Sequence, residues 1–133
     1  MRAWIYNRVK ACAGLDAEYA GNVISSGSGD NPQGRFLLIA MNPEQPALGL
    51  PAAAQAQGIP FTVYVYAGTD GDMVSVDNAC IALKNGIPTE DGVVVGNMSV
   101  YQVKWEESGE DGYDDHFNRN VRPVRFSMMT KSG

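Results

Sequence analysis

The sequence predicts an α+β fold in which a mainly antiparallel β-sheet packs against two helices, within a single domain spanning residues 1–133. Three observations predict it. Expected strands outnumber expected helices, the segment 61–66 alternates cleanly between two faces, and a polar segment joins the last two strands as an antiparallel pair. A chain of 133 residues is long enough to enclose one hydrophobic core.

Two segments carry apolar residues at helical spacing. In residues 2–13 these are Trp4, Ile5, Val9 and Cys12, and Gly14 follows to end the helix. In the second helix they are Val76, Ala79, Cys80 and Leu83, with Asp72 placed to cap its start and Gly86 its end. Both cysteines lie on apolar sides, so we expect buried free thiols, with a disulfide as the alternative.

Short apolar or alternating runs predict the remaining strands. A linker from Gly21 to Gly34 contains one candidate for a short edge strand, at 22–26. Further strands are expected at 36–41, 93–95, 98–105 and 120–130. The run 36–41 is continuously apolar, which is typical of a strand buried on both faces. Within 98–105, strict alternation places Tyr101, Val103 and Trp105 opposite Val100, Gln102 and Lys104. Pro123 lacks an N–H donor, which predicts a sheet edge or a bulge at that position.

The segment 42–58 is expected to be a long loop, because it holds three prolines and two glycines. Connections of this length are uncommon in compact domains. We expect it to pack as an arm on a neighbouring subunit, or to become ordered only when one arrives.

The most unusual feature is an acidic hairpin loop at about residues 106–119. It holds six carboxylates, and three arginines follow at its end and in the last strand; these nine candidate interface residues are Glu106, Glu107, Glu110, Asp111, Asp114, Asp115, Arg119, Arg122 and Arg125. Carboxylates at this density repel one another, so they must be solvated or met by cations from another surface. Pairing with the arginines within the same chain is the alternative. Arg122 and Arg125 should point to opposite faces of their strand and so form no single patch.

The sequence contains few of the residue patterns that catalysis, metal binding or nucleic-acid binding requires. The formal net charge of −5 argues against a protein that binds nucleic acid by neutralising phosphates. The chain has one histidine, His116, no Gly-x-Ser-x-Gly nucleophile motif, and no acidic spacing that fits a calcium loop. We therefore expect no enzymatic activity, no catalytic, cofactor-binding or metal-binding residue, and no cofactor.

Neither the first ten residues nor the apolar runs of the chain predict a membrane partner. The first ten residues carry charges within any apolar run, unlike a signal peptide. The longest uncharged stretch, 45–69, is broken by prolines and glycines, so it cannot form a spanning helix. We expect a soluble protein that is intracellular when made.

The C-terminal third resembles the closing hairpin of the tail terminator proteins of long-tailed bacteriophages. The resemblance rests on the strand ending at Trp105, the run SGEDGYDDHF from Ser108, and the run VRPVRF from Val121. In that family the strand ending in Trp is followed by a Ser, a turn with an Asp pair, and an Arg that opens the last strand; here these are Ser108, Asp114 with Asp115, and Arg122. Upstream, the strand 61–66, the turn 68–72 and the helix beginning near Val76 and Asp77 are similar as well, so the resemblance covers residues 35–130.

The resemblance implies a structural virion protein without chemistry. Proteins of this family form a homo-hexameric ring that caps the head-proximal end of the tail tube, stops tube polymerisation, and contacts a neck (head–tail connector) protein. DNA passes through the lumen without specific binding. Such a protein is assembled in the host cytoplasm and resides in the virion. Six copies at −5 give a formal charge of −30 per ring, which lets a polyanion slide rather than bind.

We hypothesise that the acidic hairpin lies toward the lumen or a subunit seam, with the three arginines reaching carboxylates across that seam, because the sign of the charge changes abruptly within one hairpin. Two other functions stay open. One is another ring component of the neck or tail tube, and the other is a small acidic enzyme or binding module.

Overall fold

Three helices and eight strands make up the part of the chain that the computed structural model describes, which is residues 2–25, 32–41, 45–46, 56–89, 92–95 and 98–132. The helices are α1 (Arg2–Lys10), α2 (Ala17–Gly21) and α3 (Met73–Gly86). The strands are β1 (Val23–Ser25), β2 (Phe36–Met41), β3 (Gln45–Pro46), β4 (Ala56–Tyr66), β5 (Val93–Val95), β6 (Met98–Ser108), β7 (Gly112–Asp114) and β8 (Arg119–Ser132).

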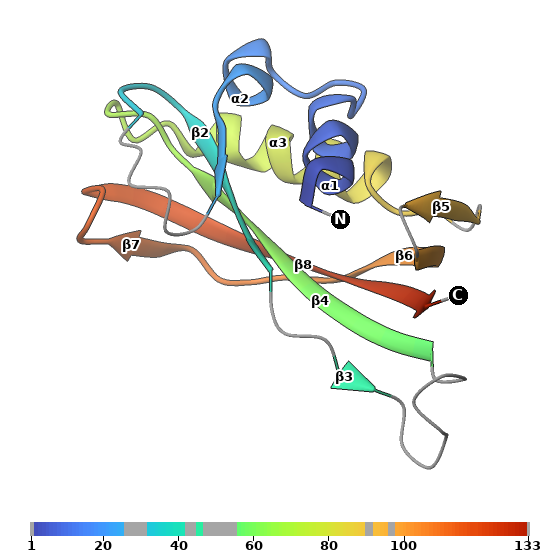
Figure 1. Cartoon of the computed structure of the whole chain (residues 1–133). Coiled ribbons are helices and arrows are strands. Elements are labelled where there is room, and N and C mark those ends of the chain that lie inside the picture. Colours follow the sequence, from blue (N-terminus) through green and yellow to red (C-terminus); the bar gives the residue numbers. More distant parts are fainter. Residues whose placement is uncertain are drawn as a thin grey trace.

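All eight strands form one sheet, whose main path runs β1-β2-β4-β8-β6-β5. The short strands β3 and β7 pair with β4 and β8. Every pair is antiparallel except β1 with β2, which is parallel. The helices lie over one face of this sheet, and β5 and β7 lie toward its opposite ends (Figure 1). The predicted α+β class, with a mainly antiparallel sheet in one unit, is confirmed.

One hydrophobic core lies between the helices and the sheet. The predicted stripes of both longer helices face it, because Ile5 and Val9 of α1, Cys12 just after α1, and Val76, Ala79, Cys80 and Leu83 of α3 are buried in the same cluster. The strands contribute Leu37, Ile39, Phe61, Val63, Val65, Val100, Val103, Val124, Phe126 and Met128. Both cysteines are free and buried, as expected. At about 25 cal/mol per Å² of buried apolar surface, this cluster provides the main driving force for folding.

The helices differ from the prediction in two respects. The first helix ends at Lys10 rather than at residue 13, and Gly14 turns the chain with φ +82°. Between the first helix and the predicted linker lies a helix that was not predicted, α2, whose cap is Asp16 accepting from the Glu18 amide at 2.8 Å. Five residues give too few turns for a helical period to be recognised. Tertiary contact stabilises α2 instead, because the buried Tyr19 hydroxyl donates to the carbonyl of Tyr66 at 3.1 Å.

Two predictions for the central strands were wrong. The β2 strand is not fully buried on both faces, since Leu37 and Ile39 are buried while Leu38 and Ala40 are half-buried. No helix of the described residues covers that second face (Figure 1). The β4 strand begins at Ala56 rather than near residue 61, and Gln45–Pro46 pairs with it, so part of the 42–58 segment is strand. Residues 42–44 and 47–55 lie outside the described residues, and the arm stays a prediction.

The β6 strand breaks the strict alternation predicted for it. Val100 and Val103 are both buried on the core face, opposite Thr130 and Met128. A register shift between Val100 and Gln102 permits this, because one extra residue reverses the side to which later side chains point.

Pro123 is in a central strand, not at an edge. Its carbonyl accepts from the Gly109 amide at 2.7 Å, just where the partner of β8 changes from β6 to β7. The amide and carbonyl of a strand residue point to the same side, so the missing donor of the proline faces that break in the ladder. Pro123 therefore lies at an irregular position of the ladder, as predicted, but this position is inside the sheet and not at its edge.

Candidate assembly surface

The acidic segment is built as a strand end, a short strand and a turn rather than as one loop. Strand β6 continues through Glu106 and Glu107 to Ser108, and β7 then pairs with the start of β8. The connection from β7 to β8 is a four-residue turn, 115–118, in which Asn118 has φ +56°. Asparagine tolerates this left-handed conformation better than most residues, so the turn is compatible with its sequence.

Arg122 holds the acidic segment to helix α3. Its Nε and Nη2 donate to the two carboxylate oxygens of Asp111 at 2.6 and 3.2 Å, and its Nη1 lies 2.6 Å from Oδ1 of Asp77. The hydrogen bond from Arg122 lowers the pKa of Asp111 below its ordinary value. This fork geometry is specific to arginine, because a lysine presents one charge without parallel donors.

The exposed pairs of the segment are also made within the chain. Arg125 lies 3.1 Å from Glu107, and Lys104 lies 3.7 Å from Glu106, which also accepts from the Ser127 hydroxyl. Exposed pairs of this kind are worth about 0–1 kcal/mol each. They neutralise the segment locally more than they stabilise the fold.

Arg119 is buried and contacts no carboxylate among the described residues. Its guanidinium donates to four backbone carbonyls, at 2.7 to 3.2 Å; the acceptors are those of Pro32, Gln33, Gly34 and Ala67. The side chain therefore ties the start of β8 to the segment before β2. Its predicted contact with another subunit stays a prediction, and within the chain these carbonyls occupy its guanidinium.

Asp114 ties the hairpin to the sheet. Its Oδ2 accepts from the Tyr66 hydroxyl at 2.6 Å, and its Oδ1 accepts from the amides of His116 and Phe117 at 2.8 and 3.4 Å. Partial burial would raise the pKa of Asp114, but these hydrogen bonds outweigh that effect and lower it. Phe117 packs edge-on against the stacked rings of Tyr66 and Phe36, so the turn is held on the sheet face that the helices leave open.

Three side chains at the tip have exposed ends. Glu110 and Asp115 are exposed and have no ion pair with any described residue, and Tyr113 between them is 59% exposed. We name residues 110–115 the hairpin tip. It combines negative charge with one large ring.

The structure thus gives the nine predicted residues different environments. Intrachain pairing, the alternative to contacts across a seam, describes Arg122 and Arg125 in this chain. Whether the segment faces a lumen or a seam stays a prediction.

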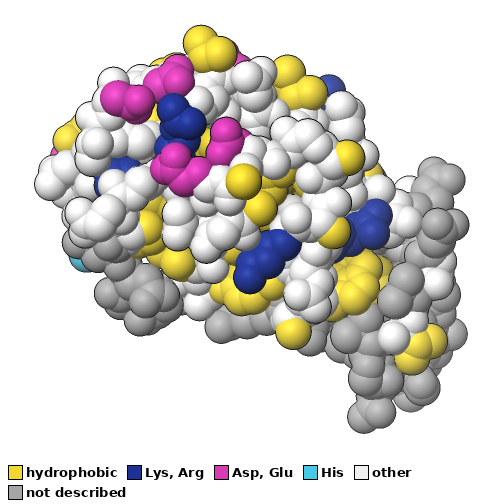
Figure 2. Space-filling model, turned by 90° about the horizontal axis from the view of Figure 1, so that it is seen from above, with side chains coloured by type: hydrophobic (Ala, Val, Ile, Leu, Met, Phe, Trp, Pro, Cys, Tyr) yellow, Lys and Arg dark blue, Asp and Glu magenta, His cyan; other side chains and the backbone are white. Residues whose placement is uncertain are grey.

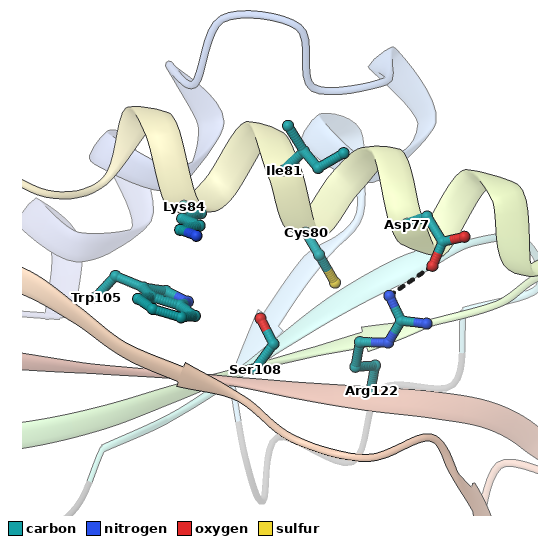
Figure 3. A pocket seen from close by; sticks show the side chains of 7 residues that line it. All are labelled: Asp77, Cys80, Ile81, Lys84, Trp105, Ser108 and Arg122. Carbon is teal, nitrogen blue, oxygen red and sulfur yellow. Dashed lines mark ion pairs between the residues drawn. The ribbon is translucent and has the colours of Figure 1, made fainter.

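A groove between α3 and strands β6 and β8 was missed by sequence reasoning. It has a volume of about 470 Å³ and is lined by Asp77, Cys80, Ile81, Lys84, Trp105, Ser108 and Arg122 (Figure 3). The Lys84 ammonium lies 4.1 Å from the centre of the Trp105 ring. Burial raises the pKa of the Cys80 thiol, which also lines the groove. No local pattern predicts the groove, because its two walls come from segments twenty or more residues apart.

The charge distribution differs along the helical face of the molecule. Figure 2 shows acidic side chains gathered around basic ones at one end, while elsewhere on this face basic and hydrophobic side chains lie next to one another. No three potential metal ligands cluster among the described residues. Within the same residues, no helix has the length and apolar character needed to cross a membrane.

Comparison with known proteins gives a structural likeness alone. No protein-family model matches the chain, and no curated protein matches it. A chain in the virion of a native gene transfer agent (GTA) particle matches with a TM-score of 0.71 at 13% identity, covering 97% of this chain and 92% of that one. A second solved structure, which carries no functional name, matches with a TM-score of 0.62 at 16% identity, covering 99% and 94%. The chain therefore shares its complete fold with a component of a virion.

Proposed function

We propose that this chain is a structural virion protein of the tail terminator type, which forms a ring on the head-proximal end of a tail tube and stops tube growth. The observation that carries the proposal is the likeness to a chain of the GTA virion over nearly the full length of both chains. The similarity of the C-terminal hairpin to tail terminators supports it independently, because that similarity rests on residues and not on the fold.

The two faces of the sheet differ in a way that suits a ring with two neighbours. The helices cover one face, and the other face is open in that no described helix lies over it (Figure 1). Register places Thr62 opposite Arg125 and Tyr64 opposite Pro123, so the open face carries a mixture of aromatic, charged and proline side chains. A cap needs one surface for the tube and a different one for the neck protein, and these two faces provide such a difference.

The charges of the chain suit a lumen through which DNA passes. Six copies at −5 give six times −5, or −30, per ring. A wall of this sign repels a polyanion and so avoids retaining it. Glu110 and Asp115 have no ion pair with any described residue, and we place the hairpin tip at a subunit seam. The 42–58 arm is proposed to pack on a neighbouring subunit.

Native mass spectrometry over a series of protein concentrations tests the ring. Six copies of the 14.3 kDa chain give six times 14.3, or about 86 kDa. A species of that mass is expected. A monomer or dimer at every concentration contradicts the ring and favours the small enzyme or binding module instead. A ring that does not affect tube growth is the signature of a different neck or tail-tube component.

A further inference from the structure

The groove between α3 and β6 holds unpaired hydrogen-bond donors above an apolar floor. Lys84 has no carboxylate within ion-pair distance among the described residues, and its ammonium lies against the Trp105 ring. The indole nitrogen of Trp105 is buried and has no acceptor in the described part of the chain. An unsatisfied buried donor costs about 1–3 kcal/mol, so an acceptor that enters the groove is favoured. Arg122 adds no free charge, because Asp77 and Asp111 occupy it.

The walls of the groove favour an aromatic occupant that carries a carboxylate. Ile81 is 59% exposed on the helical wall, and Trp105 forms the floor on β6 (Figure 3). The volume of about 470 Å³ lies in the range of pockets that enclose a ligand of several rings or side chains. Tyrosines that fill such pockets contribute strongly to protein interfaces, since they combine area with low conformational entropy.

The hairpin tip has the complementary features. Tyr113 offers an exposed ring, and Glu110 and Asp115 offer carboxylates that no described cation meets. Both surfaces are therefore incomplete in the single chain, in opposite ways.

The tip of one copy does not fill its own groove. Asp111 of the tip binds Arg122 at one end of the groove, but no hydrogen bond or ion pair joins Glu110, Tyr113 or Asp115 to Lys84 or Trp105. The bond from Tyr66 to Asp114 and the packing of Phe117 hold the end of the hairpin on the sheet face away from the helices. Trp105 pairs with the core residue Phe126, so the groove is on the helical face. Two different surfaces of a chain that bind each other between copies produce head-to-tail contacts, which close into a ring or continue as a filament.

We propose that the hairpin tip of one copy enters the groove of the next, with Tyr113 against Trp105 and Ile81, and with Glu110 or Asp115 paired to Lys84. This rests on the proposed ring and names the contact that closes it.

Disulfide trapping tests the contact. Two proteins are made in a Cys80→Ala background, one with Ile81→Cys on the groove and one with Tyr113→Cys on the tip. After mixing and mild oxidation, a linked dimer containing one copy of each is expected. Replacing the groove variant by Val94→Cys is the matched control, since Val94 is 74% exposed on β5 and does not line the groove. That pair should stay unlinked.

A charge exchange provides the second measurement. Lys84→Glu should weaken self-association by at least about tenfold, which corresponds to about 1.4 kcal/mol. Combining it with Glu110→Lys and Asp115→Lys in the same chain should restore association, because every copy then carries both exchanged surfaces. These positions are exposed, and circular dichroism confirms that each variant is folded.

The outcomes separate the contact from the ring. Rings that form without the Ile81–Tyr113 link, and that Lys84→Glu leaves intact, overturn the contact and leave the proposed function standing. A linked product between Ile81→Cys and tail tube protein, in place of the tip, also overturns it. A chain that never self-associates overturns both proposals.

Discussion

The hydroxyl of Tyr66 donates a 2.6 Å hydrogen bond to Oδ2 of Asp114, and this bond joins the centre of the sheet to the acidic hairpin. Burial raises the pKa of Tyr66, and the bond to the carboxylate raises it further, so the hydroxyl is a donor throughout the neutral range. The hairpin that we place at a subunit seam is therefore positioned from within its own chain before any partner arrives.

Replacing Tyr66 by Phe should destabilise the protein at neutral pH by about 1.5–3 kcal/mol, the worth of a hydrogen bond to a charged group. The ring stays, so its stacking on Phe36 at 4.3 Å is kept. Urea unfolding measures the difference. Tyr64→Phe on the same strand face is the matched control and should change stability little, because no hydrogen bond joins its hydroxyl to a described residue. Equal effects of the two variants would contradict the role given to the Tyr66–Asp114 bond.

Stability should fall as the solution is acidified below about pH 4, the ordinary range of aspartate. The pKa values of Asp72, Asp111 and Asp114 are lowered in the folded chain by hydrogen bonds to their carboxylates. A lowered folded pKa contributes stability that is present above the unfolded pKa and lost as pH falls through the folded one. Urea midpoints between pH 6 and pH 2 measure this loss.

Two substitutions in the hairpin separate specific from general charge effects in that profile. Asp114→Asn should lower the midpoint at neutral pH and flatten its decline in acid, while Asp115→Asn should leave the profile close to that of the parent chain. A profile that is unchanged by Asp114→Asn would show that the acid loss comes from net charge and not from this carboxylate.

Arg119→Met should destabilise the protein by about 3 kcal/mol, because it leaves several buried or partly buried carbonyls without a donor. Arg119→Lys should recover only part of the loss, since one ammonium cannot match the planar fork. Arg125→Ala is the control, with an expected effect of about 0–1 kcal/mol for an exposed pair. Thermal unfolding compares the three. A small effect of Arg119→Met would contradict its structural assignment.

Gly86→Ala should destabilise the protein by about 1–3 kcal/mol through overpacking, although alanine favours a helix over glycine by about 1 kcal/mol. A Cβ at this position would lie 2.7 Å from Sγ and 3.1 Å from Cα of Cys12. Adding Cys12→Ala should recover part of the loss, because it removes the sulfur but not the backbone contact. Calorimetry of both variants measures this, and a stabilising Gly86→Ala would show that α1 and α3 are less closely packed.

Local signals predicted the parts of the fold that depend on local chemistry. Asp72 caps α3 by accepting from the Val74 amide at 3.0 Å and from the Ser75 hydroxyl at 2.9 Å, as its position before an apolar stripe indicates. The alternation of 61–66 was equally reliable, because Phe61, Val63 and Val65 belong to the core cluster and the even-numbered residues do not. The bulges in β6 and the parallel pairing of β1 with β2 were not predicted, because they depend on partner strands that no short window of sequence contains.

The candidate site shows the same division. Density of charge identified the acidic hairpin, but it did not reveal which residues were already paired. Arg119 donates to carbonyls 52 to 87 residues away in the sequence, and Arg122 pairs with Asp77 of α3. The partners of these two arginines therefore could not be predicted from sequence spacing. The Lys84–Trp105 groove was missed for that reason as well, since its polar groups become a site only when α3 lies above β6.

The length distribution of tail tubes assembled in vitro tests the central claim most directly. Purified tube protein is allowed to polymerise with and without this protein, and tube lengths are measured by electron microscopy. The account predicts that added protein arrests growth, so that tubes are shorter at a given time and carry a ring at one end. Tubes of unchanged length with bare ends, in the presence of folded and self-associated protein, would contradict it.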